Sequence, residues 1–325
     1  MIKKLFVIAV MAFSSLYAQE PVGSAGAKFL SISVVPRASG LGDAFVAIAN
    51  DPSSVFWNPA GIAHIKNFAF FTSYSNWIAD GRVPAFAVIF PKYPLGTFSF
   101  FVSGIYMGGF EGTAFDKNNN IVETGTFSYS ALQLGLAMSR FYTDKFAAGV
   151  SIKFIEENLG SVTSAYSFAI DAGTYFYTGF KSIRVAMSLQ NLGTDMSPKG
   201  DYDLWLMQGS EVTTEKRKYE SYSLPLTFRL GIAGDIIKEG NKIKRLTASV
   251  EIINPKDNAE SFAVGLEMEP IRMIVLRAGY HFNLDEGGLG AGATINLGGN
   301  KKVDFSYNDF GHLPDVLRLG LTFER

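Results

Sequence analysis

Beyond residue 67 the chain alternates between apolar residues and polar or small ones. In 145–155, apolar residues such as Val150 occupy every second position, and Lys145, Ser151 and Lys153 lie between them. Successive side chains of a strand point to opposite faces, so the pattern predicts a strand with one apolar and one polar face. The same division recurs in 132–139, 168–175, 227–234, 245–252, 262–268, 274–280, 303–308 and 316–323.

About fourteen segments fit such a strand pattern. They lie near 67–77, 82–90, 95–106, 126–140, 145–157, 162–177, 182–193, 222–237, 242–253, 261–268, 272–282, 288–297, 302–308 and 316–323. Every even-numbered connection between them is short, and the two longest, 107–125 and 194–221, are odd-numbered. Bacterial membrane barrels have even strand numbers, short periplasmic turns and longer outer loops. Both termini are then expected at the periplasmic side.

Two arrangements could bury the apolar face of these strands. A soluble sandwich would turn it inward, whereas a membrane barrel would turn it toward lipid. The polar face is rich in Gly, Ala and Ser with isolated charges, and many segments reach about ten residues, as a tilted membrane strand requires. The sequence therefore predicts an all-β, 14-stranded antiparallel transmembrane β-barrel spanning 67–325, preceded by a lead-in and plug in 19–66.

The segment 37–63, RASGLGDAFVAIANDPSSVFWNPAGIA, differs from everything after it. Its apolar residues recur at helical spacing and predict a short helix near 42–49, which Asp51 and Pro52 end. The sequence 58–61, NPAG, predicts a tight turn. We interpret the segment as a compact plug packed against the barrel. Its candidate functional residues are Arg37, Gly40, Gly42, Asp43, Asn58, Pro59 and Gly61.

Residues 1–18 have the pattern of a secretory signal peptide. Lys3 and Lys4 precede an apolar stretch of about nine residues, and small residues follow before Gln19. The alternative, a membrane anchor, would need about 20 apolar residues. Export and a barrel together place the protein in the bacterial outer membrane.

Composition excludes several classes of function. The net charge of −1 lacks the basic footprint of a nucleic-acid-binding protein, and the chain has no Cys for disulfides or thiolate chemistry. His64, His281 and His312 have no partners at metal-ligand spacing. No hydrolase elbow or dinucleotide fingerprint is present. We therefore expect a non-enzymatic protein without metal or cofactor.

Nine charged residues fall on the polar, lumen-facing sides of predicted strands. They are Lys153, Asp171, Arg229, Arg245, Glu251, Glu267, Arg277, Asp304 and Arg318. Charges in a confined lumen are costly unless paired, so we expect them to pair with each other, with the plug or with water. A polar conduction path is the alternative. Arg37 and Asp43 are the expected plug partners, which predicts that ion pairs pin the plug to the wall.

The polar segment 194–221 is interpreted as a solvated loop, with partner binding as the alternative. The plug segment resembles the signature of the PorV/PorQ family of outer-membrane proteins, which belongs to a wider group related to the FadL long-chain fatty acid transporters. Further matching segments are 134–161, 169–173 (AIDAG), 185–193 (VAMSLQNLG), 224–234, 275–282 and 288–295.

The resemblance implies a 14-stranded barrel with an N-terminal plug in a type IX secretion system. It implies partners that include secretion-system proteins and the C-terminal domains of secreted cargo, besides outer-membrane lipid. It does not distinguish a PorV-like from a PorQ-like role. The alternatives are a FadL-like transporter of hydrophobic small molecules such as fatty acids, and a lipid-modifying enzyme, which would need a partner for His281 or His312.

Overall fold

The computed structural model describes residues 23–325 except 116–119, 161, 209–210 and 239–242. The predicted signal peptide therefore lies outside the described residues. The described residues form sixteen strands, and their bounds are β1 (Ala69–Asn76), β2 (Arg82–Lys92), β3 (Gly96–Phe115), β4 (Ile121–Thr143), β5 (Phe146–Leu159), β6 (Thr163–Tyr177), β7 (Arg184–Gly193), β8 (Asp201–Gln208), β9 (Glu211–Lys218), β10 (Thr227–Lys238), β11 (Arg245–Pro255), β12 (Ser261–Ile271), β13 (Ile274–Phe282), β14 (Leu289–Gly298), β15 (Lys301–Asn308) and β16 (Val316–Glu324).

Fourteen of these strands form a closed antiparallel barrel, and β1 closes it by pairing with β16. The predicted fold class is thus confirmed. Strand β5 shows how the alternation is used: Val150 and Ile152 are 53% and 58% exposed on the outer wall, while Ser151 and Lys153 are buried toward the lumen. An apolar outer surface around a polar interior is the pattern of a membrane barrel.

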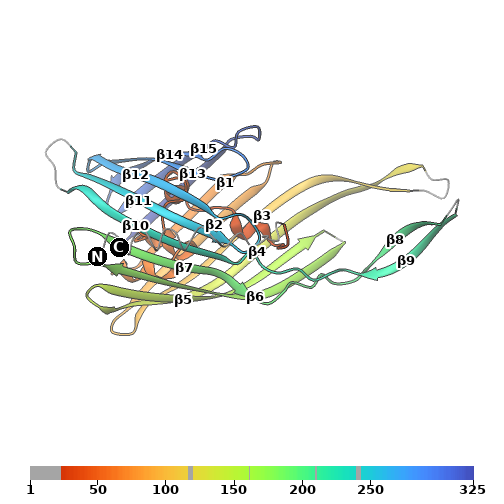
Figure 1. The fold of residues 1–325 in the computed structure, drawn as a ribbon, viewed down its shortest axis with the longest axis horizontal. Coiled ribbons are helices and arrows are strands. Elements are labelled where there is room, and N and C mark those ends of the chain that lie inside the picture. The colour runs from red at the N-terminus through yellow and green to blue at the C-terminus, as the bar shows by residue number, and fades with distance from the viewer. Residues whose placement is uncertain (1–22, 116–119, 161, 209–210, 239–242) are drawn as a thin grey trace, which may run out of the picture.

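The two long connections contain more strand than the sequence predicted. Strands β3 and β4 remain paired as far as Phe115 and Ile121, so 107–125 is mostly a ribbon, on which Phe110 stacks against Phe127. The interpretation of 194–221 as a plain loop was wrong, because it contains the hairpin β8–β9. Both ribbons project from the same end of the barrel (Figure 1). The loop-length rule predicts that this end faces outward from the cell, and it is called the outer end below.

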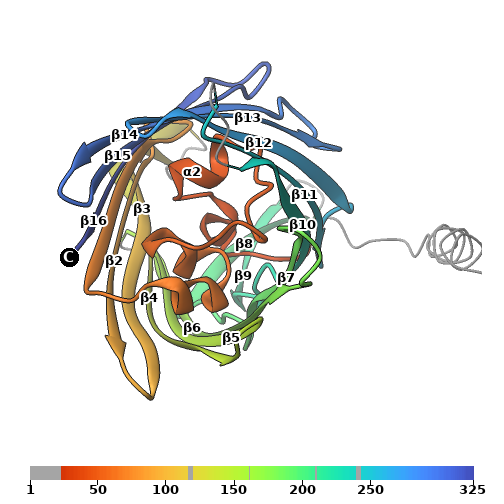
Figure 2. The same cartoon turned by 90° about the vertical axis from the view of Figure 1, so that its left-hand side faces the viewer.

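Inside the ring of strands lies the plug, in which the described residues form four short helices (Figure 2). They are η2 (Lys28–Ser31), α2 (Pro36–Ser39), η3 (Pro52–Phe56) and η4 (Pro59–His64). In each of the last three, a proline lies in the first turn. Proline is tolerated there because the backbone N–H groups of the first turn have no acceptor within the helix. Asp51 caps η3 through Ser53 N at 2.9 Å.

The helix predicted near 42–49 is absent, because this stretch forms irregular turns. Gly42 and Asp43 have φ of 59° and 71°, in the left-handed region that interrupts a right-handed helix. The N–H groups of Phe45 and Val46 bond to a wall carboxylate instead of to helical carbonyls. The predicted turn at 58–61 is the start of η4, where Asn58 Oδ1 accepts from Ala60 N at 3.0 Å.

The two ends of the described chain lie at opposite ends of the barrel. Gly23 N donates to Asp257 O in the β11–β12 connection, at the end that carries the ribbons. Arg325 N donates to Phe68 O at the other end, which faces the viewer in Figure 2. The C-terminal position agrees with the predicted side. The lead-in, by contrast, enters the lumen from the outer mouth, a path that strand parity could not reveal.

Candidate functional site

Arg37 links the plug to the barrel wall. Its guanidinium donates from Nε and Nη2 to the two carboxylate oxygens of Glu267 on β12, at 2.9 and 3.0 Å. Its Nη1 donates to Asp51 Oδ2 and Asn50 Oδ1 within the plug, at 2.7 and 2.9 Å. Burial opposes protonation, but Glu267 and Asp51 raise the pKa of Arg37 above its ordinary value. One side chain thus connects plug and wall.

Glu267 also holds the neighbouring strands together. Arg277 on β13 donates to it at 2.8 Å, and Arg245 on β11 donates at 3.3 Å. Arg277 continues the chain of charges to Asp304 on β15 at 3.3 Å. This network joins four of the predicted lumen charges and includes Arg37.

Glu251 on β11 binds the plug backbone directly. It is 1% exposed, and its Oε2 accepts from the N–H groups of Phe45 and Val46, both at 2.7 Å. Its Oε1 accepts from Trp57 Nε1 at 3.3 Å and from Arg229 Nη1 at 3.0 Å. The Arg229 guanidinium lies 4.2 Å from the Trp57 ring centroid. A single carboxylate therefore satisfies four donors, three of which belong to the plug.

Asp43 contacts the wall through His281. His281 Nδ1 lies 3.3 Å from Asp43 Oδ2, and its Nε2 lies 2.9 Å from Ser261 Oγ. Burial acts to raise the pKa of Asp43, but the His281 hydrogen bond and nearby positive charges hold it below its ordinary value. Arg318 on β16 donates to Ser33 O at 2.9 Å and to Asn308 Oδ1 at 2.6 Å.

The remaining predicted lumen charges, Lys153 and Asp171, pair within the wall. Their Nζ and Oδ1 atoms lie 2.7 Å apart, between β5 and β6. Asp171 also accepts from Ser151 Oγ at 2.9 Å and from Asn191 N at 2.8 Å. The structure therefore places all nine charges in polar contacts, four of them directly with plug atoms (Arg229 through Trp57).

Glycines on the inner wall let the plug approach closely. A Cβ on Gly279 would lie 2.0 Å from Leu41 C, one on Gly173 would lie 2.0 Å from Asn58 Oδ1, and one on Gly149 would lie 2.6 Å from Pro59 C. On the plug side, a Cβ on Gly40, Gly42 or Gly61 would lie 3.0, 2.5 or 2.4 Å from its nearest backbone atom. Sequence reasoning missed the wall glycines, although their position on the polar strand faces was a signal.

The histidines form no metal centre. His64 lies 2.9 Å from Tyr177 Oη, and burial lowers its pKa. His312 lies 3.1 Å from a Glu286 oxygen in the outer loops. The described residues contain no group of three His, Cys, Asp or Glu that could hold a metal ion.

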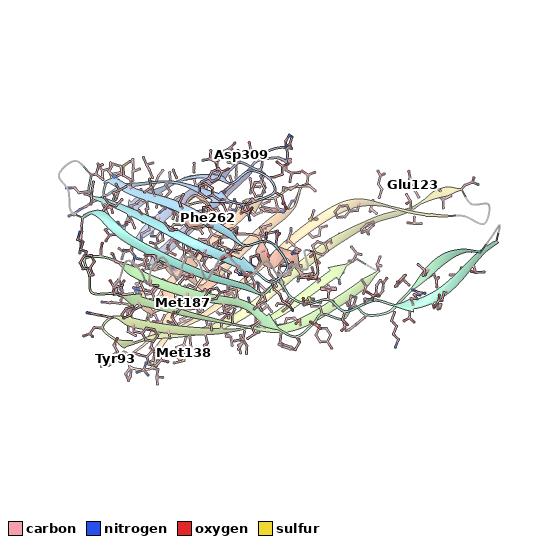
Figure 3. All side chains as sticks on the ribbon, viewed as in Figure 1. Tyr93, Glu123, Met138, Met187, Phe262 and Asp309 are labelled. Atoms are coloured by element: carbon pink, nitrogen blue, oxygen red, sulfur yellow. The ribbon has the colours of Figure 1, made fainter. Side chains whose placement is uncertain are left out.

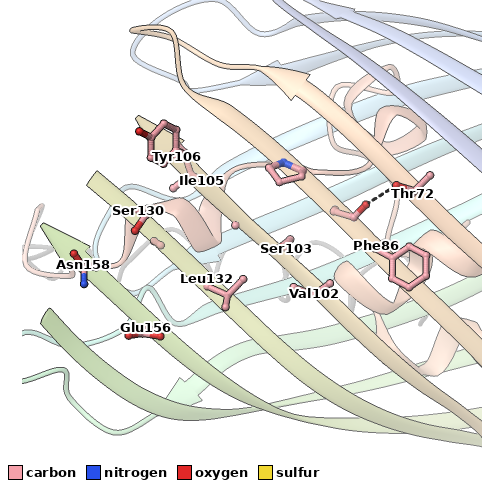
Figure 4. A pocket seen from close by; sticks show the side chains of 14 residues that line it. Thr72, Phe86, Val102, Ser103, Ile105, Tyr106, Ser130, Leu132, Glu156 and Asn158 are labelled. Carbon is pink, nitrogen blue, oxygen red and sulfur yellow. Dashed lines mark hydrogen bonds between the residues drawn. The ribbon is translucent and has the colours of Figure 1, made fainter. Parts of the chain in front are cut away.

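Sequence reasoning also missed a pocket of about 500 Å³ in the barrel wall (Figure 4). Here the ladder between β2 and β3 is interrupted: Arg82 pairs with Tyr106 and Ala85 with Ser103, but no ladder pair joins the strands at Val83 and Pro84. Proline lacks a backbone donor, so it weakens a ladder at this point. Fourteen residues line the pocket: Thr72, Pro84, Ala85, Phe86, Val102, Ser103, Gly104, Ile105, Tyr106, Ser130, Ala131, Leu132, Glu156 and Asn158.

The wall pocket combines residues from both faces of the barrel. Phe86 and Tyr106 are among the exposed outer side chains, whereas Ala85, Ile105 and Ala131 are buried and belong to the core cluster that includes the plug. The pocket lies near the outer end of the wall, because Pro84 is close to the start of β2. A second pocket, of about 470 Å³, lies at the outer mouth between the lead-in and the loops, and is more polar, with Lys28, Asp257, His281 and Arg318 in its lining.

The chain was compared with known proteins. Neither a known family's sequence profile nor a curated protein matches it. Among solved structures, the toluene transporter TbuX of Ralstonia pickettii is similar with a TM-score of 0.60 and 13% identity, over 89% of this chain and 97% of that chain. The monoaromatic hydrocarbon channel CymD is similar with a TM-score of 0.60 and 13% identity, over 90% and 98%. A FadL homologue of Pseudomonas aeruginosa has a TM-score of 0.53 and 13% identity, over 88% and 97%.

At this identity the similarity concerns the fold. The chain forms a closed 14-stranded barrel similar in fold to these proteins. These structural neighbours are transporters and channels. Within the described part of the chain, no helix is long and apolar enough to cross a membrane.

Proposed function

We propose that this protein is an outer-membrane channel through which hydrophobic small molecules pass by way of the wall pocket between β2 and β3. The observation that carries the proposal is the missing ladder at Val83 and Pro84, with a pocket of about 500 Å³ at that point. Ligand pockets for small molecules usually measure about 300–1,000 Å³ and are mainly apolar.

The plug supports a lateral rather than an axial route. Arg37, Glu251 and His281 fix it to the wall, and Leu41, Phe45 and Ile62 of the plug are fully buried. A molecule entering from the mouth would have to displace these contacts. The wall pocket instead joins outer-surface residues to buried ones without crossing the ion-pair network. The toluene transporter TbuX has a similar fold, which is consistent with the passage of hydrophobic small molecules.

The test is uptake across a membrane with a lipopolysaccharide outer leaflet, which slows spontaneous entry of a hydrophobic fluorophore. Ser130→Trp places a large ring in the wall pocket. Ala291→Trp, on the exposed outer face of β14, is the matched control. We expect the wild type and the control to accelerate uptake, and Ser130→Trp to lose most of the acceleration. Equal uptake by both variants and wild type would refute the lateral route.

A second candidate, partner binding in type IX-like secretion, is favoured by the outer ribbons. Strands β3 and β4 and the hairpin β8–β9 extend beyond the barrel (Figure 3), where Glu123 is labelled on the first ribbon. Isolated two-stranded ribbons gain little stability alone, and their free edges can pair with an added strand. The resemblance to the PorV/PorQ family supports cargo domains or secretion-system proteins as partners.

Affinity purification from the native outer membrane tests this second candidate. Deleting residues 198–220 removes the β8–β9 hairpin and leaves the barrel order intact. We expect the full chain, but not the deletion variant, to recover secreted proteins that share a C-terminal domain. Recovery of the barrel with hydrophobic molecules alone would favour the channel.

A further inference from the structure

We infer that the wall pocket selects hydrophobic molecules that carry a hydrogen-bond donor, a hydroxyl or an amine, over carboxylates of the same shape, and that Glu156 is the acceptor. This inference rests on the proposed channel function and adds a substrate class to it. It assigns a role to a carboxylate that the plug–wall network does not use.

Glu156 is the one charged side chain among the described residues that line the pocket. Among the described lining residues, the other polar ones are Thr72, Ser103, Tyr106, Ser130 and Asn158, and none is Lys, Arg or His. Two of these groups are already engaged: Thr72 Oγ1 donates to Ala85 O at 3.1 Å, and Ser103 Oγ accepts from Gln133 at 2.6 Å. The pocket therefore offers a negative charge within an apolar lining.

Glu156 lies on the outer, exposed face of β5, in register with Leu132 on β4 and Tyr166 on β6. Figure 4 shows its carboxylate on the same side of the pocket as Leu132 and Asn158. Among the described residues, none donates a hydrogen bond to the Glu156 side chain or forms an ion pair with it. Its neighbour Glu157 points the other way and accepts from Tyr222 Oη at 2.6 Å.

The neighbouring Glu157 is thus satisfied by the protein, whereas Glu156 retains its acceptor capacity. A carboxylate beside apolar surface is costly unless it gains hydrogen bonds, and charge-assisted hydrogen bonds are the strong ones. A ligand hydroxyl or ammonium would supply such a bond at the pocket. A ligand carboxylate would meet a like charge with no cation in the lining to offset it.

The experiment compares three ligands that differ only in the polar group: 4-butylbenzyl alcohol, 4-butylbenzylamine and 4-butylbenzoate. Binding to the full chain in lipid nanodiscs is measured by equilibrium dialysis against empty nanodiscs. We expect the amine and the alcohol to bind about tenfold more tightly than the benzoate, as one charge-assisted hydrogen bond allows. Glu156→Gln should lower the affinity for the amine and raise the affinity for the benzoate, so that the two affinities become similar.

Glu260→Gln is the matched control, because Glu260 is an exposed acid in the β11–β12 connection and the change in net charge is the same. It should leave the ranking unchanged. Equal binding of the three ligands, or equal effects of the two Gln variants, would overturn the role of Glu156 while leaving the channel intact. If none of the ligands bound above empty nanodiscs, the proposed function itself would fail. A preference for the benzoate would contradict the inference directly.

Discussion

Removing the Glu251 carboxylate should release the plug. In Glu251→Ala, the N–H groups of Phe45 and Val46 and the Trp57 indole lose their acceptor, and Arg229 loses its ion-pair partner. Each of the three plug donors left buried without an acceptor costs about 1–3 kcal/mol, whereas the Arg229–Glu251 pair lies within the wall and adds little to plug docking itself. These terms are not additive, and Arg229 retains Gln190 at 3.1 Å. We expect a loss of about 5 kcal/mol in plug docking.

Trypsin cleavage after Arg37 measures this loss, because Arg37 is protected while the plug is docked. A change of about 5 kcal/mol corresponds to about 3.5 orders of magnitude in the opening equilibrium. Cleavage, followed by mass spectrometry, should therefore accelerate strongly in Glu251→Ala, while circular dichroism shows the barrel still folded. Glu260→Ala, at an exposed acid in an outer loop, is the control. The reasoning is refuted if Glu251→Ala is cleaved at the wild-type rate.

Three further predictions concern the plug and its path. Gly279→Ala should displace the plug, because the added Cβ would lie 2.0 Å from Leu41 C. The control Gly234→Ala should leave the plug in place, because the atom nearest to its added Cβ is 3.7 Å away. The rate of plug proteolysis distinguishes the two variants. Burial acts to raise the pKa of Asp51, but the positive charge of Arg37 outweighs burial and holds this pKa below its ordinary value of 3.8. A carboxyl whose pKa is lower in the folded than in the unfolded protein stabilises the fold at pH values above its unfolded pKa. Plug docking should therefore persist at neutral pH and weaken below about pH 4, as proteolysis with an acid-active protease would show. Weakening already at pH 6 would contradict this prediction. An epitope inserted ahead of Gly23 should bind antibody on intact cells and one after Arg325 should not; the reverse pattern would invert the orientation.

The barrel was predictable because its strands carry a local signal. Period-two alternation in 145–155 depends on lipid outside and plug or water inside, and both conditions hold along the whole strand. The even strand number then indicated a closed barrel, which the pairing of β1 with β16 confirms. The extension of β3 and β4 was not predictable, because ribbon pairing beyond the membrane has no apolar stripe to mark it.

The plug was predictable as a unit but not in its conformation. Its apolar spacing suggested a helix at 42–49, yet Asp43 at φ 71° and the acceptor Glu251, some two hundred residues away in sequence, determine the backbone there. The pairing of Arg37 with Glu267 rather than with another lumen acid also depends on barrel register. The wall pocket was not foreseen, because Pro84 alternates correctly with its neighbours and reveals its effect only against β3.

The most direct test of the account is where a hydrophobic molecule binds. A photoreactive alkyl diazirine can be incorporated into membranes that contain the protein, and its adducts mapped by peptide mass spectrometry. Competition with an excess of 4-butylbenzyl alcohol removes labelling that is specific. The account predicts competed adducts concentrated on 83–86 and 102–106, at the gap between β2 and β3. Adducts spread evenly over the outer wall, without competition at these residues, would contradict it.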